Sequence, residues 1–93
     1  NIAHAGTPSE QFLPTYVRGI LREFFRDQGI LDPRILVLSQ DRVTYELAFS
    51  LESLGNPPAG EHAGIAEAIG WFLPPHYSLI LISEKGLPAF SSL

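Results

Sequence analysis

Residues 43–52, Val-Thr-Tyr-Glu-Leu-Ala-Phe-Ser-Leu-Glu, decide the fold class of this chain. The large apolar side chains, from Val43 to Leu51, fall on one parity, and the polar or small ones, from Thr44 to Glu52, fall on the other. This alternation is the period of a β-strand with one face in a core and one face toward water. A helix would scatter the same apolar residues around its axis, so we interpret the stretch as a half-buried strand.

Two further stretches predict strands of a different kind. Residues 34–39, Arg-Ile-Leu-Val-Leu-Ser, and residues 77–83, Tyr-Ser-Leu-Ile-Leu-Ile-Ser, are apolar on both parities. Each is too short for a core helix, which favours a strand with both faces covered. Because only residues 40–42 separate the first of them from 43–52, we expect these two strands to form an antiparallel hairpin.

The segments that flank the strands predict helices. Leu13-Pro14 opens the first helix, since proline suits the first helical turn, and Gly29 ends it. Residues 61–73 predict a second helix, and residues 87–93 read as the beginning of a third. The first helix carries a broad apolar stripe made of Tyr16, Val17, Ile20, Leu21, Phe24 and Phe25.

The expected fold is α+β with the order α-β-β-α-β. A right-handed crossover through the second helix is expected to set the strand 77–83 parallel to 43–52 if both lie in one sheet. We expect it to lie beside 34–39, which gives a three-stranded, mainly antiparallel sheet of order 2-1-3 with helices packed on one face. The alternating strand then lies at an edge, where a wet face is tolerated. We expect residues 1–12 to be a flexible arm or linker and 13–93 to be a single α+β domain.

Composition narrows the classes of partner. A chain of 93 residues is one domain, and its net charge of −4 lacks the strong basic surface of a nucleic-acid-binding protein. There is no cysteine, which excludes disulfides and thiolate metal sites, and no apolar run reaches the ~18–20 residues that cross a bilayer. We expect a cytoplasmic protein that binds neither nucleic acid nor membrane.

Catalytic motifs are missing from the sequence. It has no Gly-x-Ser-x-Gly elbow, phosphate loop or dinucleotide fingerprint, and His4, His62 and His76 lack the spacing of metal ligands. We predict a protein that is not an enzyme, with no catalytic residue, no metal and no cofactor. The alternative of an enzyme would require acids or histidines from separate elements to converge in a cleft.

The functional prediction is based on the two strands that are apolar on both parities, 34–39 and 77–83. Two helices cover one face of a three-stranded sheet, so the other face would present Leu36, Leu38, Ile80 and Ile82 to water, as a larger apolar surface than a monomer usually exposes. We predict that these residues form an interface with a second copy, as a homodimer, or with a partner domain. Alternatively, the N-terminal arm and the third helix cover this face.

The polar face of the first helix offers a second hypothesis. Arg18, Arg22 and Arg26 recur every four residues and could form a ligand-binding ridge for an amino acid or an anion. The alternative is a solvated face on which Glu23 pairs with Arg26.

The order of elements resembles the C-terminal domain of the enhanced serine sensitivity (SseB-like) family of bacterial proteins. The resemblance rests on Leu13-Pro14, on the strands at 35–38 and 45–52, and on Leu73-Pro74 before the strand at 79–82. Glu84-Lys85-Gly86 before an apolar segment completes it. Members usually end in a longer helix with a Pro-Phe-Tyr motif and carry a second domain, and neither feature is in this sequence. The resemblance implies a cytoplasmic bacterial interaction domain without established catalytic residues.

Overall fold

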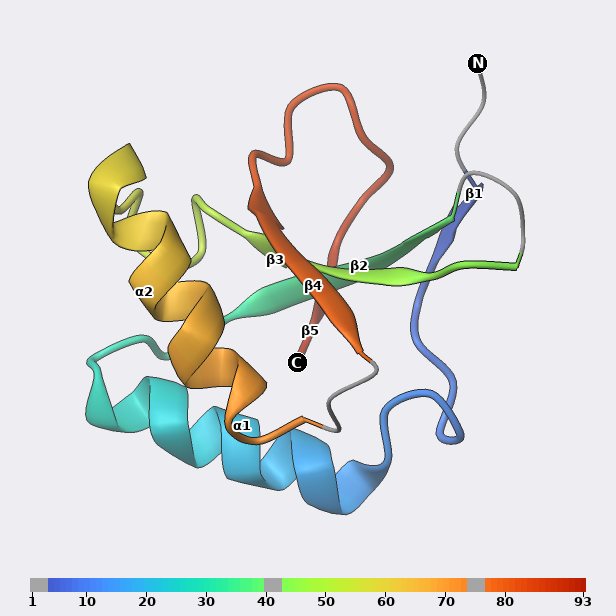
Figure 1. Cartoon of the computed structure of the whole chain (residues 1–93), viewed down its shortest axis with the longest axis horizontal. Coiled ribbons are helices and arrows are strands. Elements are labelled where there is room, and N and C mark those ends of the chain that lie inside the picture. Colours follow the sequence, from blue (N-terminus) through green and yellow to red (C-terminus); the bar gives the residue numbers. More distant parts are fainter. Residues whose placement is uncertain (1–3, 40–42, 74–76) are drawn as a thin grey trace.

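The computed structural model describes residues 4–39, 43–73 and 77–93, which form two helices and one mixed five-stranded sheet (Figure 1). The fold class is α+β, as the sequence predicts. The elements follow in the order β1 (His4–Gly6), α1 (Thr15–Asp27), β2 (Arg34–Ser39), β3 (Glu46–Ser50), α2 (Ala59–Gly70), β4 (Ser78–Ile82) and β5 (Ser91–Ser92).

Helix α1 has a defined beginning and end. The carboxylate of Glu10 accepts hydrogen bonds from the backbone N–H and the hydroxyl of Thr15, at 2.9 and 2.7 Å, and so satisfies a free donor of the first turn. Gly29 adopts a φ of 83° and ends the helix where the sequence predicts. The side that faces the core consists of Val17, Leu21 and Phe25.

The central strand of the sheet is β3. It pairs antiparallel with β2, from Ile35 opposite Phe49 to Leu38 opposite Glu46, which confirms the predicted hairpin. On its other side it pairs in parallel with β4, with Leu47 beside Leu79. The predicted order 2-1-3 is therefore wrong, because the strand that follows α2 lies beside β3 and not beside β2.

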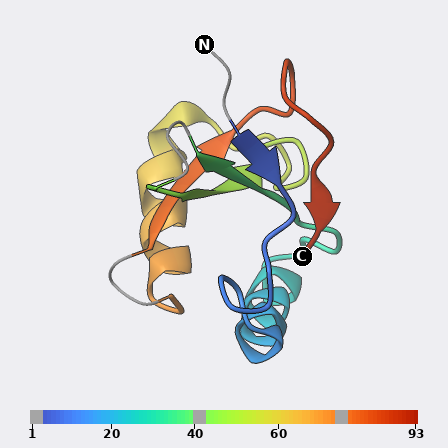
Figure 2. The same cartoon turned by 90° about the vertical axis from the view of Figure 1, so that its right-hand side faces the viewer.

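The physical reason lies at the far edge of β2, which two short strands already occupy. Strand β1 pairs antiparallel with residues 37–39 and β5 pairs antiparallel with residues 34–35, so both lie along the same side of β2 (Figure 2). Only the free side of β3 remains for β4. Strand β1 lies within the segment 1–12 that was expected to be an arm or linker.

The expected third helix at 87–93 is also wrong. These residues run through a loop into β5 and end at Leu93, which is buried and whose N–H donates to the carbonyl of Pro33 at 2.9 Å. Pairing with β2 supplies the backbone partners that a helix would otherwise have supplied.

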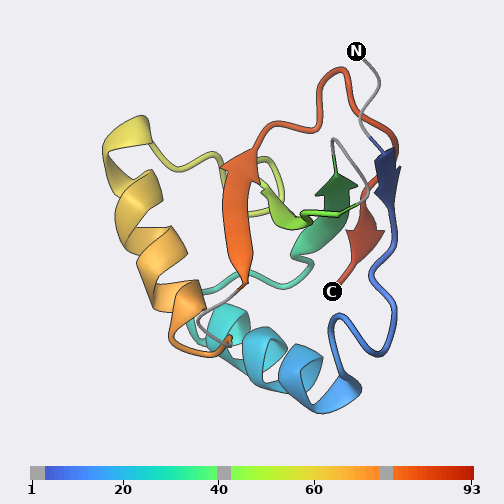
Figure 3. The same cartoon turned by 45° about the vertical axis from the view of Figure 1, so that its right-hand side comes forward.

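The two faces of the sheet are covered in different ways. The core lies between the helices and one face of the sheet, and Figure 3 shows how the helices are placed. Leu21 and Phe25 of α1 and Ile69 of α2 join the inward side chains of three strands there. The loop between β4 and β5 lies on the side of the sheet away from α1 (Figures 1 and 2). The inward side chains of the sheet are Ile35, Val37, Leu47, Phe49, Leu79 and Leu81.

Strand β3 has no wet face, contrary to the expectation from its alternation. Ala48 and Ser50, on the parity that was expected to face water, are both 0% exposed. The side chains are small enough to be covered by their neighbours, and the Ser50 hydroxyl has hydrogen-bond partners. Small residues are therefore compatible with either side of a sheet, and alternation alone does not identify an edge strand.

Candidate functional site

Strand β4 is an outermost strand of the sheet, with α2 beside it (Figure 3), and it has one hydrogen-bonding edge that no strand of the described residues occupies, which we call the open edge. Among the described residues it pairs with β3 alone, and Figure 1 views the sheet from this edge, with β4 in front of the other strands. Its sequence, Ser-Leu-Ile-Leu-Ile, contains none of the prolines, glycines or charges that protect edge strands. Residues 79–82 are partly exposed, whereas Leu47, Ala48 and Phe49 in the same rows of β3 are fully buried. A strand added beside β4 would cover this remaining apolar surface.

The four predicted interface residues share the sheet face away from the helices. Leu36 and Ile80 both flank Ala48 in one row across the sheet, and Ile82 lies in the row of Ser50. Leu36 is buried, and the other three, Leu38, Ile80 and Ile82, are partly exposed. The chain itself thus covers part of the face that was expected to be open. Ile80 and Ile82 differ from the other two because they also lie on the open edge.

A polar cluster joins the carboxyl ends of β3 and β4 to the beginning of β2. The buried Ser50 hydroxyl donates to the carboxylate of Glu84 and accepts from the N–H of Ser53 at 3.1 Å. Arg34 donates to the same Glu84 oxygen from Nε at 2.8 Å and from Nη2 at 2.7 Å. The buried Ser50 hydroxyl is hydrogen-bonded both as a donor and as an acceptor. The cluster therefore holds together the segments that follow β3 and β4. The sequence gives no signal for it, because its members lie on three distant segments.

A second carboxylate orders the loop that follows β4. Glu52 accepts from the Ser83 hydroxyl at 2.6 Å and from the N–H of Glu84 at 2.9 Å. These hydrogen bonds, that of Ser83 first, hold the pKa of Glu52 below its usual range because they stabilise the carboxylate. Together with the Ser50 cluster, they position the loop that leads from β4 to β5.

The three arginines predicted to bind a ligand lie on α1, and two of them contact backbone carbonyls. Arg18 donates to the carbonyl of Pro8 at 3.1 Å, and Arg22 donates to the carbonyl of Leu93 at 2.7 Å. Arg26 is exposed in the last turn. Among the described residues, no arginine lines the cavity beside β1 or the cavity between α1 and α2. A ligand-binding role for this ridge remains a prediction.

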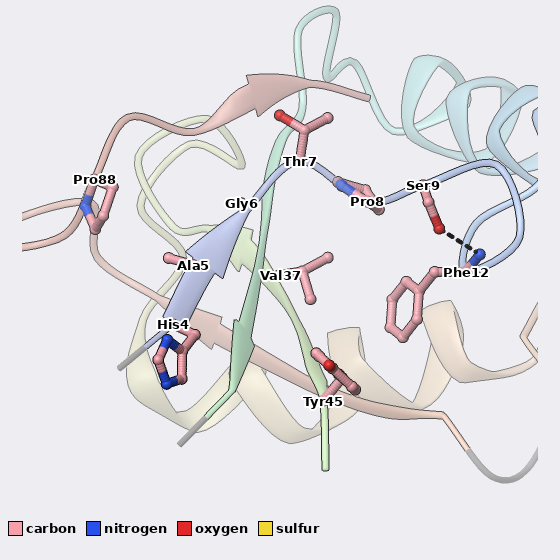
Figure 4. Close-up of a pocket in the computed structure, with 10 residues that line it drawn as sticks. All are labelled: His4, Ala5, Gly6, Thr7, Pro8, Ser9, Phe12, Val37, Tyr45 and Pro88. Atoms are coloured by element: carbon pink, nitrogen blue, oxygen red, sulfur yellow. Dashed lines mark hydrogen bonds between the residues drawn. The ribbon is translucent and has the colours of Figure 1, made fainter. Parts of the chain in front are cut away.

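The larger of these cavities, about 750 Å³, lies beside β1 (Figure 4). One wall is the segment 4–9, and the other carries the side chains of Phe12, Val37 and Tyr45. The ring of Phe12 stacks on that of Tyr77, with centroids 5.1 Å apart. Its size and aromatic lining are typical of sites for small apolar molecules. The sequence did not point to it, because its walls come from segments far apart in the chain.

Within the described parts of the chain, no three histidine or acidic side chains gather as a metal-binding group. None of the helices in these parts is long and apolar enough to cross a membrane. His62, one of the histidines singled out in the sequence, contacts the carbonyl of Pro57 through Nε2 at 2.9 Å. His76 lies outside the described residues.

The comparisons with known proteins give no identification. No protein-family model, no curated protein and no solved structure matches the chain. The resemblance to the enhanced serine sensitivity family, and the bacterial and cytoplasmic role that it implies, therefore stay predictions. The open edge, the sheet face and the cavities are the features of the molecule that bear on its function.

Proposed function

We propose that this chain is a non-enzymatic interaction domain that assembles with a second copy of itself through the outer edge of β4. The observation that carries the proposal is the open edge of five residues without proline, glycine or charge. Unpaired backbone donors and acceptors on such an edge are a template for another strand.

A twofold axis suits this edge. If two β4 strands pair antiparallel with Ile80 of one copy opposite Ile80 of the other, each strand meets the same surface that it presents. The row Leu36–Ala48–Ile80 then continues into the same row of the second copy. Because β4 carries no charge, the two copies meet there without repulsion, although the chain has a net charge of −4.

The opposite edge of the sheet is a poorer candidate. It is formed by β1 and β5, which are three and two residues long, and very short strands are one of the ways in which proteins protect an edge. The asymmetry between the two edges favours a closed dimer over an open chain of copies.

The test is the molecular mass in solution, measured by sedimentation velocity up to about 1 mM, because a single strand pair buries less than about 1,200 Å² and is expected to be weak. We expect a dimer for the unmodified protein and a monomer for Ile80→Lys, with circular dichroism to verify folding. The matched control is Leu31→Lys, at an apolar residue that is 84% exposed and distant from β4 in the chain, and it should still dimerise. A monomeric unmodified protein, or a folded Ile80→Lys variant that dimerises, would contradict the proposal.

A second candidate function is a small-ligand sensing domain, and the cavity beside β1 favours it. Phe12, Val37 and Tyr45 suit an amino acid with an aromatic or aliphatic side chain better than a bare anion. Titration of the labelled protein with phenylalanine, leucine, aspartate and phosphate, followed by NMR, tests this. Shifts confined to the amides of these three residues with the apolar amino acids are expected. Shifts with phosphate as large as those with the apolar amino acids would instead favour anion binding by the arginines of α1.

A further inference from the structure

A second cavity, of about 580 Å³, lies between the C-terminal half of α1 and helix α2. Phe24 and Phe25 form its α1 wall, and Ile65 and Ala68 form its α2 wall. Gly64 also lines it, and nothing lies within 4 Å of the point where its Cβ would be, so this part of the wall is open. Helices α1 and α2 approach each other toward the C-terminal end of α2 and diverge away from it (Figures 1 and 3). We call this cavity the α1–α2 groove.

Exposed apolar side chains extend the groove at its narrow end. The ring of Phe24 contacts that of Phe72, with centroids 5.3 Å apart, and the neighbouring Trp71 is 82% exposed. On α1, Tyr16 and Ile20 precede Phe24 at intervals of four residues and are 73% and 44% exposed. Side chains at this spacing lie on one side of a helix. The groove and these residues form one apolar surface that is suited to the apolar side of another helix.

Acidic residues border this surface. Glu61 is the one charged residue among the described groove lining, and Glu67 lies one turn before Trp71 on α2. Glu23 and Asp27 are exposed on α1, three positions after Ile20 and Phe24 respectively, and so adjoin the same apolar row.

The basic side chains of α1 and α2 do not line the groove. Helix α2, Ala-Gly-Glu-His-Ala-Gly-Ile-Ala-Glu-Ala-Ile-Gly, contains no lysine or arginine. Arg18 and Arg22 of α1 donate to the carbonyls of Pro8 and Leu93, outside the groove lining. Arg26 is exposed but lies two positions after Phe24, so it is on another side of α1, and it does not line the groove. The groove is therefore apolar with a negative border.

We propose that the α1–α2 groove binds an amphipathic helix with a basic polar face, whose apolar side chains enter the groove beside Phe24 and Ile65. Charge complementarity selects this partner over a second copy, because two copies would bring Glu23, Asp27 and Glu67 against like charges. The proposal uses α1 and α2 and is independent of the strand pairing at β4.

Trp71 is the single tryptophan of the chain and belongs to the exposed apolar surface that extends the groove, so its emission reports binding to that surface. The probe is a synthetic amphipathic helix of about 18 residues built from leucine and lysine, and the comparison peptide carries glutamate in place of lysine. We expect the leucine–lysine peptide to shift Trp71 emission to the blue and to bind more weakly as salt is added. The leucine–glutamate peptide should leave the emission unchanged. Equal binding of both peptides, or no shift with either, would overturn the proposal.

The sharper variant is Glu67→Lys, which is compatible with folding because a cation in the last turn of a helix is favourable. We expect it to weaken binding of the leucine–lysine peptide about tenfold and to permit binding of the leucine–glutamate peptide. The matched control, Gln11→Lys with Ala89→Lys, raises the net charge equally at exposed residues outside the groove lining and should bind as the unmodified protein does. Equal weakening in the control would mean attraction by overall charge and would overturn the proposal. Trp71 emission that changes with protein concentration alone would assign the groove to a second copy.

Discussion

Ser50 illustrates how a single polar residue can be buried at the end of the central strand of the sheet. Its hydroxyl is fully buried, donates to Glu84 and accepts from Ser53, so no polar atom of the side chain lacks a partner. A buried hydroxyl without such partners would cost about 1–3 kcal/mol. The satisfied hydroxyl allows β3 to be buried on both faces although its sequence alternates.

Glu52 should make the stability of the fold depend on pH. Its pKa is lowered in the folded state, first by the hydrogen bond from Ser83, so it contributes stability above the ordinary glutamate pKa of about 4.3. That contribution is lost as the pH falls through the lowered pKa. We expect Ser83→Ala to lower Tm at pH 7 and to have little effect at pH 2, where the carboxyl is protonated in both states. A difference in Tm that is the same at both pH values would show that Ser83 acts through packing alone.

At the scale of elements, the burial of β3 predicts the effect of enlarging Ala48. This side chain lies between Leu36 and Ile80 on the face away from the helices and is 0% exposed. Ala48→Leu should therefore reduce the free energy of unfolding by about 1–3 kcal/mol through overpacking. Urea denaturation measures it, with Val43→Thr as a control at a site that is 80% exposed. Equal stabilities for the two variants would mean that this face of β3 is open to water.

The longer elements could be predicted from local patterns, unlike β1, β5 and the segment 87–93. Residues 34–39 form β2 as expected, and β4 (Ser78–Ile82) lies within the predicted 77–83. Gly29 follows the end of α1 at Asp27 and adopts the positive φ that glycine tolerates best. Period, turn residues and caps are properties of neighbouring residues, so a sequence reports them directly.

The pairing of the strands could not be predicted in the same way. The doubly apolar pattern of β2 is compatible with either neighbour, and the choice was decided by β1 and β5, whose two or three residues carry no periodic signal. The same limit applies to the candidate sites. The predicted Ile80 and Ile82 do lie on the open edge, but the cavity beside β1 and the α1–α2 groove depend on contacts between distant segments.

At the scale of the whole molecule, assembly through β4 predicts thermal stability that depends on concentration. Dimerisation that occurs only in the folded state stabilises it by mass action, so Tm should rise with protein concentration. Differential scanning calorimetry from about 10 µM to 1 mM measures the rise, over the range expected for a weak interface. Ile80→Lys should give a Tm that does not change with concentration. A constant Tm in the unmodified protein would contradict a dimer whose formation is coupled to folding.

The shared side of β2 has a consequence for how quickly the chain folds. Strands β1 and β5 lie end to end along it, so the edge is completed only when residues from the two ends of this sequence have both returned to the middle. Pairings of such long sequence separation carry a large loop-closure cost and slow folding. The β2–β3 hairpin closes a short loop and can form early. We therefore expect a kinetic intermediate in which the hairpin exchanges its amide hydrogens slowly while the outer amides of β2 still exchange rapidly.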